Sequence, residues 1–209
     1  MTAAADPWPT IHGERHALAE DLEGLTDEQW ATPSLCPGWT VRDVLAHMTS
    51  TAHMSTGRFI AGFTGTGFRF HDMSNKHIRQ EEEVGTAQML AKFASLADSN
   101  GRPPGPVDTM LGEVLVHSED IRRPLGIAHE YPKDAAVRAV EFFRGSNLLI
   151  GGKRRAEGLT WRATDIDWSA GEGPEVAGPA MSLALAVTGR RQAFDDLTGE
   201  GLAVLRNRQ

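Results

Sequence analysis

Apolar side chains along the first 125 residues recur at helical spacing, and breaks rich in glycine and proline divide them into separate segments. The expected helices cover residues 8–25, 40–64, 73–97 and 109–123. Thr40 is expected to cap the second helix, and Asp108 the fourth. Pro124 and Gly126 are expected to end the fourth helix. Four helices of this length predict a helical bundle.

The pattern changes after the fourth helix. One further helix is expected over residues 134–150, and the alternating "GLTWRATDIDWSA" segment is typical of a strand or hairpin. "PEVAGPAMSLALAVTGR" predicts a helix that Gly189 ends, and "GLAVLRN" predicts a closing strand. The expected fold is therefore mainly α, with a four-helix bundle over residues 1–128 and a small C-terminal α+β region over residues 129–209.

Composition and charge exclude several classes of protein. The chain has 209 residues, a net charge of −7 and 40% hydrophobic residues, which predicts a soluble globular protein without a nucleic-acid partner. No apolar run approaches the roughly 18 residues of a membrane span, and the N-terminus lacks a signal-peptide pattern. A single cysteine, Cys36, cannot form an internal disulfide, so a cytoplasmic location is expected. We interpret Cys36 as a small packing residue beside a turn.

Candidate chemistry lies on the second and fourth helices. Glu113 and His117 are four residues apart and share one helical face, beside an apolar stripe. His47 holds an equivalent place within "CPGWTVRDVLAHM". Two histidines and one carboxylate form a metal site with positions open for water or substrate, which suits zinc and also admits Fe(II), Ni(II) or Mn(II). Asp43 or Asp120, each one turn from a histidine, could hold its second ring nitrogen.

Other histidines offer weaker alternatives, because a Glu–His pair at this spacing is more often a surface pair than a metal site. His12 and His16, followed by Glu20, are also four apart, but they lie on the wetter side of the first helix and are expected to be solvated. His53 falls on a different face from His47.

Two segments, "PSLCPGWTVRDVLAHM" and "GEVLVHSEDIRRPLG", resemble the signature segments of the mycothiol-dependent maleylpyruvate isomerase family, within the DinB-like metalloenzyme superfamily. The tail from residue 178 to 205 is also similar to that family. The resemblance implies a bundle that binds a divalent metal, usually zinc, through His47, Glu113 and His117. It also implies mycothiol as cofactor, whose metal-activated thiolate would attack an electrophilic small molecule. Isomerisation or S-transfer would follow.

The resemblance further implies an arginine from the C-terminal region in the site. Arg190 and Arg191 are the candidates, with Arg206 a third, although a solvated basic pair explains the first two equally well. Asn75 and Arg79, one turn apart, are candidates for cofactor binding. Two alternatives stay open: another metal-dependent enzyme such as a hydrolase, and a non-catalytic small-molecule-binding protein. The expected partners are an electrophilic substrate and a low-molecular-weight thiol, with the chain as monomer or homodimer.

Overall fold

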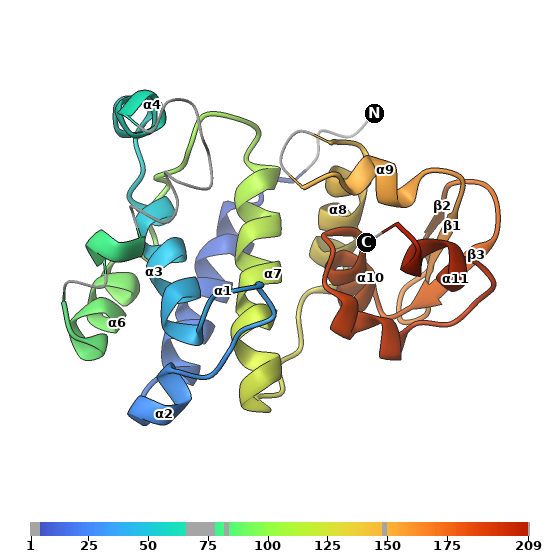
Figure 1. Cartoon of the computed structure of the whole chain (residues 1–209). Helices are drawn as coiled ribbons and strands as arrows, with labels where there is room; N and C mark the ends of the chain where they lie inside the picture. The colour runs from blue at the N-terminus through green and yellow to red at the C-terminus, as the bar shows by residue number, and fades with distance from the viewer. Residues whose placement is uncertain (1–4, 66–77, 82–83, 148–149, 209) are drawn as a thin grey trace. The chain divides into compact units, whose positions relative to one another are not determined.

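The computed structural model describes residues 5–65, 78–81, 84–147 and 150–208 (Figure 1). The chain divides into two compact units, Met1–His129 and Glu130–Gln209. Helices dominate the described residues, and the strands all belong to one small sheet in the second unit. The expected fold class, a mainly α protein with a small C-terminal α+β region, is confirmed.

Four helices form a bundle in the first unit. They are α1 (Trp8–Asp21), α3 (Val41–Ala52), α6 (Thr86–Ser95) and α7 (Asp108–Leu125). Helices α1 and α3 each pack against both α6 and α7, so the four helices enclose one core. Fully buried apolar side chains from all four helices fill it: Ile11, Leu18, Val44, Leu45, Met89, Phe93, Val114 and Leu115. The short helix α2 (Asp27–Trp30) precedes the loop that leads into α3.

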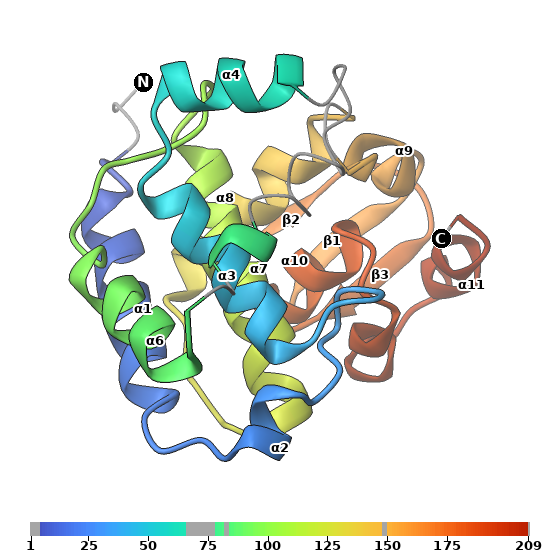
Figure 2. The same cartoon turned by 60° about the vertical axis from the view of Figure 1, so that its left-hand side comes forward.

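Helix α3 is shorter than the sequence predicted. The expected helix over residues 40–64 is broken after Ala52, and α4 (Thr56–Gly65) turns away across the end of the bundle (Figure 2). The Ala52 carbonyl accepts a hydrogen bond from Ser99 Oγ at 2.7 Å, and the Met54 carbonyl accepts one from the Arg102 N–H at 2.9 Å. A Cβ at Gly101 would lie 2.3 Å from the Ala52 oxygen. The loop after α6 therefore takes carbonyl groups that a continuous helix would need.

The third and fourth helices also differ from expectation at their ends. Residues 78–81 are helical, but α6 begins only after Gly85, and residues 66–77 lie outside the described residues. Asp108 is the first residue of α7 rather than its cap. Pro124 lies inside the last turn of α7, and Gly126, with a φ of 69°, ends the helix.

Pro124 has a consequence inside the bundle. It has no backbone N–H, so it cannot bond the carbonyl of Asp120 four residues earlier. The Leu35 N–H donates to that carbonyl instead, at 3.2 Å. The loop between α2 and α3 is thereby attached to α7.

The second unit contains helices and a three-stranded sheet. Its helices are α8 (Lys133–Arg144), α9 (Gly152–Ala156), α10 (Ala180–Val187), the 3₁₀ helix η1 (Arg191–Asp196) and α11 (Gly201–Arg206). Its strands are β1 (Thr160–Ala163), β2 (Ser169–Ala170) and β3 (Glu175–Gly178), in the order β2-β1-β3. The β1–β2 pair is antiparallel and confirms the expected hairpin, whereas β3 runs parallel to β1.

Two expectations for this unit were wrong. The helix expected from Pro174 begins only at Ala180, because Val176 and Ala177 are buried in the strand that pairs with β1. The expected closing strand is α11, in which Gly201 and Leu205, four residues apart, are both buried. In the part of the chain that the structure describes, no helix combines the length and apolar character that crossing a bilayer requires.

Candidate metal centre

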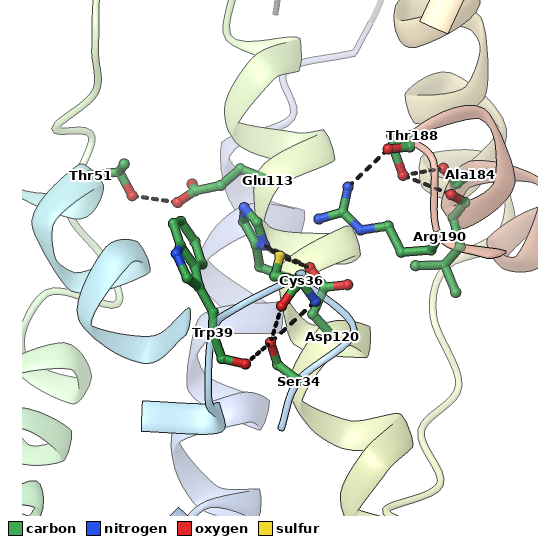
Figure 3. Close-up of polar contacts among 11 residues, drawn as sticks. Ser34, Cys36, Trp39, Thr51, Glu113, Asp120, Ala184, Thr188 and Arg190 are labelled. Carbon is green, nitrogen blue, oxygen red and sulfur yellow. Dashed lines mark hydrogen bonds and ion pairs between the residues drawn. The ribbon is translucent and has the colours of Figure 1, made fainter. Parts of the chain in front are cut away.

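The structure brings His47 of α3 and His117 of α7 together inside the first unit. The centroids of the two imidazole rings are 5.0 Å apart, and the rings meet edge to face at 77°. Glu113 lies one turn before His117 and extends from α7 toward Thr51 on α3 (Figure 3). The packing of α3 against α7 thus brings His47 and His117 together, with Glu113 one turn away on α7, although the ligand atoms of these three described residues do not all lie within 4.8 Å of one another.

Glu113 is a part-buried carboxylate whose surroundings act on its pKa in both directions. Burial raises the pKa of Glu113, while the positive charge of Arg15, the charge of His117 and the hydrogen bond from Thr51 Oγ1 lower it. Arg15 comes from α1, is 1% exposed and donates to the Ser99 carbonyl at 2.8 Å. Burial outweighs the other three effects, so the pKa of Glu113 is raised overall, although Arg15 and Thr51 favour the ionised form that binds a metal.

His117 is oriented through its second ring nitrogen. Its Nδ1 lies 2.8 Å from Oδ2 of Asp120, which has no solvent exposure. Asp43, the other carboxylate considered from the sequence, instead accepts a hydrogen bond from the Thr40 N–H at 2.6 Å and caps α3. With a proton on Nδ1 facing Asp120, Nε2 is the His117 atom that carries a lone pair for a metal.

The surroundings of His117 also make it unusually basic. Burial lowers the pKa of His117, but the hydrogen bonds with Asp120 and Cys36, together with their charges, outweigh it and raise the pKa to about 10. Without a metal, this imidazole therefore holds two protons at neutral pH. A metal that binds Nε2 must displace one of them.

Cys36 is a site residue that sequence reasoning missed. Its Sγ lies 3.0 Å from Asp120 Oδ2 and 3.7 Å from His117 Nδ1 (Figure 3), so the interpretation of Cys36 as a packing residue was wrong. Within the described residues, the ligand atoms of Cys36, His117 and Asp120 all lie within 4.8 Å of one another, and His47 and Glu113 do not join this group. No local signal links residues 36 and 120, because only the tertiary fold brings them together.

The loop before α3 places an aromatic side chain over the two histidines. Trp39 lies 5.2 Å from the His47 ring and 6.3 Å from the His117 ring, measured between centroids. Ser34 Oγ donates to the Trp39 carbonyl at 2.8 Å, and the Ser34 N–H donates to the same carbonyl at 2.9 Å (Figure 3). These bonds close the loop into a turn, which fixes Trp39 against the imidazoles.

The remaining predicted site residues belong to the second unit or to the surface of the first unit, or they lie outside the described residues. Arg190 and Arg191 belong to the second unit: Arg190 is half-buried and donates to the Thr188 carbonyl at 3.1 Å (Figure 3), and Arg191 is exposed. Arg79 is exposed in the first unit, and Asn75 lies outside the described residues. The catalytic and cofactor-binding roles suggested for these four residues stay predictions.

The alternative histidines have partners of their own. His12 and His16 contact Asn100 and Asp98, each at 2.9 Å and at the surface, in keeping with the expectation that they are solvated. His53 Nδ1 lies 2.7 Å from the Thr49 carbonyl, away from the His47 pair. Arg206 lies over the Phe194 ring at 6.0 Å, a contact that stabilises the second unit.

Comparison with known proteins finds similarity to one family in the N-terminal region and to solved structures along most of the chain. Residues 11–101 match the model of the mycothiol maleylpyruvate isomerase N-terminal domain. A crystal structure of a mycothiol-dependent maleylpyruvate isomerase is similar in fold, with a TM-score of 0.61 and 17% identity over 92% of this chain and 91% of that one. The structure of its histidine-to-alanine variant gives a TM-score of 0.62 and 16% identity over the same shares. No curated protein matches the sequence. Residues 11–101 are therefore similar to the N-terminal domain of the mycothiol maleylpyruvate isomerase family, and the fold of the chain is similar to that of a solved member.

Proposed function

We propose that the protein is a metal-dependent enzyme that uses mycothiol to isomerise, or to transfer the thiol onto, an electrophilic small molecule. The family match and the mycothiol dependence of the similar solved enzymes support the thiol and the reaction class. The observation that carries the proposal is the approach of His47 and His117 to 5.0 Å between ring centroids, with the part-buried Glu113 carboxylate one turn from His117 on α7. Maleylpyruvate, on which the similar enzymes act, is the first substrate to test.

The residues present fit a divalent metal. His47, Glu113 and His117 would hold it, because two imidazoles and one carboxylate suit zinc and leave a coordination position open. Asp120 supplies the hydrogen bond to Nδ1 that metal-bound histidines generally make. A bound divalent metal would supply Lewis acidity, which ionises a thiol and polarises a substrate carbonyl.

The side chains around these residues orient them and limit access of water. Thr51 holds one carboxylate oxygen of Glu113, and Asp120 fixes the ring of His117. Trp39 covers part of both imidazoles with an apolar surface, which lowers the local dielectric and strengthens charge interactions in the site. In this proposal Cys36 is not the nucleophile, because its thiol donates to Asp120 and the reactive thiol arrives with mycothiol.

Metal analysis combined with a turnover assay tests the proposal. We expect the purified protein to bind one divalent metal, and maleylpyruvate isomerisation to require both metal and mycothiol. His47→Ala should abolish metal binding and turnover. His53→Ala is the matched control, since it removes a histidine of the same segment whose Nδ1 bonds the Thr49 carbonyl.

The same experiment separates the alternatives. Metal-dependent hydrolysis of a test ester without any thiol would replace the proposal with a hydrolase. Absence of metal under every loading condition would remove the metal centre and leave a binding protein. Thiol-dependent turnover on another electrophile, with maleylpyruvate inert, would keep the mechanism and change the substrate.

A further inference from the structure

Three potential metal-ligand atoms meet on the Nδ1 side of the His117 ring, away from Nε2, and one of them is Nδ1 itself. Cys36 Sγ, His117 Nδ1 and Asp120 Oδ2 form a triangle with sides of 3.7, 3.0 and 2.8 Å. The three residues come from a loop and from one helix, and Asp120 is fully buried. The proposed function uses Asp120 only to orient His117 and gives Cys36 no catalytic role.

The size of the triangle is close to that of a tetrahedral thiolate site. Around a zinc-sized ion, bond lengths of about 2.3 Å to sulfur and about 2.0 Å to nitrogen and oxygen place the sulfur and nitrogen about 3.5 Å apart. The observed separation of Sγ and Nδ1 is 3.7 Å. The two sides that end on the carboxylate would have to lengthen by about 0.5 Å, since their ideal values are about 3.5 and 3.3 Å. Those two sides are hydrogen bonds that lose their protons when a cation enters.

The charges of these groups also suit a divalent cation. A thiolate from Cys36 and the carboxylate of Asp120 together carry two negative charges, and the imidazole of His117 is neutral as a ligand. A divalent ion between them would give a neutral complex in a largely buried place, which avoids the cost of an unpaired buried charge. The sulfur ligand favours soft, thiophilic ions over oxygen-seeking ones such as Mg²⁺ and Ca²⁺.

The loop that carries Cys36 is fixed before any ion binds. The Leu35 N–H donates to the Asp120 carbonyl at 3.2 Å, and the Cys36 N–H donates to Ser34 Oγ at 3.1 Å. The Trp39 N–H donates to the Cys36 carbonyl at 3.1 Å. Little conformational entropy would therefore be lost on binding, which favours affinity.

We propose that Cys36, His117 and Asp120 form a second site, specific for a thiophilic divalent cation. Binding releases the thiol proton of Cys36 and the Nδ1 proton of His117 to solvent, while the proton on Nε2 of His117 stays in place. Nε2 then has no lone pair for the metal that His47 and Glu113 would share. The two sites thus compete for one imidazole, and a soft cation at the second site would withdraw His117 from the first.

Cadmium chloride titrated into the full-length, chelator-treated protein tests this site, with the near-ultraviolet difference spectrum as readout. We expect a thiolate-to-Cd²⁺ charge-transfer band that saturates at one equivalent. His47→Ala should keep the band, because it removes only the first site. Cys36→Ser should lose it, although its hydroxyl can still donate to Asp120 and hold the loop.

Two results would overturn the proposal: Cd²⁺ binding to the wild-type protein without a thiolate band, or an unchanged band in Cys36→Ser. If the serine variant does not fold, as judged by circular dichroism, ¹¹³Cd NMR of the wild-type protein decides. A resonance in the range for one sulfur ligand supports the site, and one in the range for nitrogen and oxygen ligands alone refutes it. None of these readouts requires turnover, so failure of the proposed isomerase activity would leave the result intact.

Discussion

Replacing Asp120 with asparagine should remove most of the pH dependence of metal binding at the proposed centre. Both hydrogen bonds to Asp120, from His117 Nδ1 and from Cys36 Sγ, end on the same oxygen, so an asparagine can keep them with its carbonyl oxygen in that place. What the substitution removes is the negative charge. The pKa of His117, about 10 in the wild-type protein despite the lowering effect of burial, should therefore fall.

The magnitude follows from proton competition. A metal must displace one proton from His117 below its pKa, so wild-type affinity should rise about tenfold for each pH unit between pH 7 and 9. At pH 7, a pKa of about 10 weakens metal binding by about 10³, or about 4 kcal/mol. In Asp120→Asn the affinity should level off at lower pH, because less proton competition remains. Once proton competition is absent, the variant should bind about 10- to 100-fold more weakly than the wild type, the usual cost of losing such a partner.

Competition with a chromophoric zinc chelator at several pH values measures these slopes. Calorimetry in buffers of different ionisation enthalpy should also show about one proton released per metal at pH 7 to 8 in the wild-type protein. Asp98→Asn is the matched control, since Asp98 contacts His16 at 2.9 Å but is exposed, and it should leave the slope unchanged. A wild-type affinity that is flat between pH 7 and 9 would refute the reasoning, because His117 would then be neutral before metal binds.

Two further predictions concern one site residue and one loop. Thr51→Val leaves the part-buried Glu113 carboxylate without its hydroxyl donor, so metal affinity at pH 7 should fall about five- to tenfold, which is about 1 kcal/mol. An unchanged dissociation constant in the chelator assay would show that this hydrogen bond contributes nothing. Gly101→Ala places a Cβ 2.3 Å from the Ala52 carbonyl oxygen and should lower the free energy of unfolding by about 1–3 kcal/mol. Gly13→Ala, where a Cβ meets nothing within 4 Å, should raise that free energy by about 0.5–1 kcal/mol, and urea denaturation that ranks the two variants in the opposite order would contradict the loop contact.

Helical spacing explains why the sequence could predict the bundle and the approach of His47 to His117. An amphipathic helix fixes which residues share a face, and the apolar stripe decides which face packs inward. A polar residue beside that stripe must therefore lie near the helix interface, whatever the detailed fold. The match over residues 11–101 includes the first of the two segments that suggested the family resemblance, and the second segment lies beyond it.

The features that sequence reasoning missed depend on contacts between distant segments. Helix α3 ends at Ala52 because Ser99, in a loop 47 residues further on, binds its carbonyl. Strand β3 forms because β1 offers a parallel edge, and the apolar run of "PEVAGPAMS" fits a helix as well as a strand. Cys36 joins the site across 84 residues, which no local pattern records.

Pro124 interrupts the regular hydrogen bonding of α7, and this interruption helps to assemble the proposed metal centre. A proline near the end of a helix is usually expected only to end it. Here the missing backbone N–H of Pro124 leaves a carbonyl of α7 free to bind the loop that carries Cys36 and Trp39. Pro124→Ala would add a backbone N–H that competes with the Leu35 N–H for the Asp120 carbonyl oxygen. Helix α7 would become more regular, but the loop that carries Trp39 would be held less firmly over the imidazoles. A hydrogen bond that is missing within α7 is thus what allows the loop between α2 and α3 to be held in place.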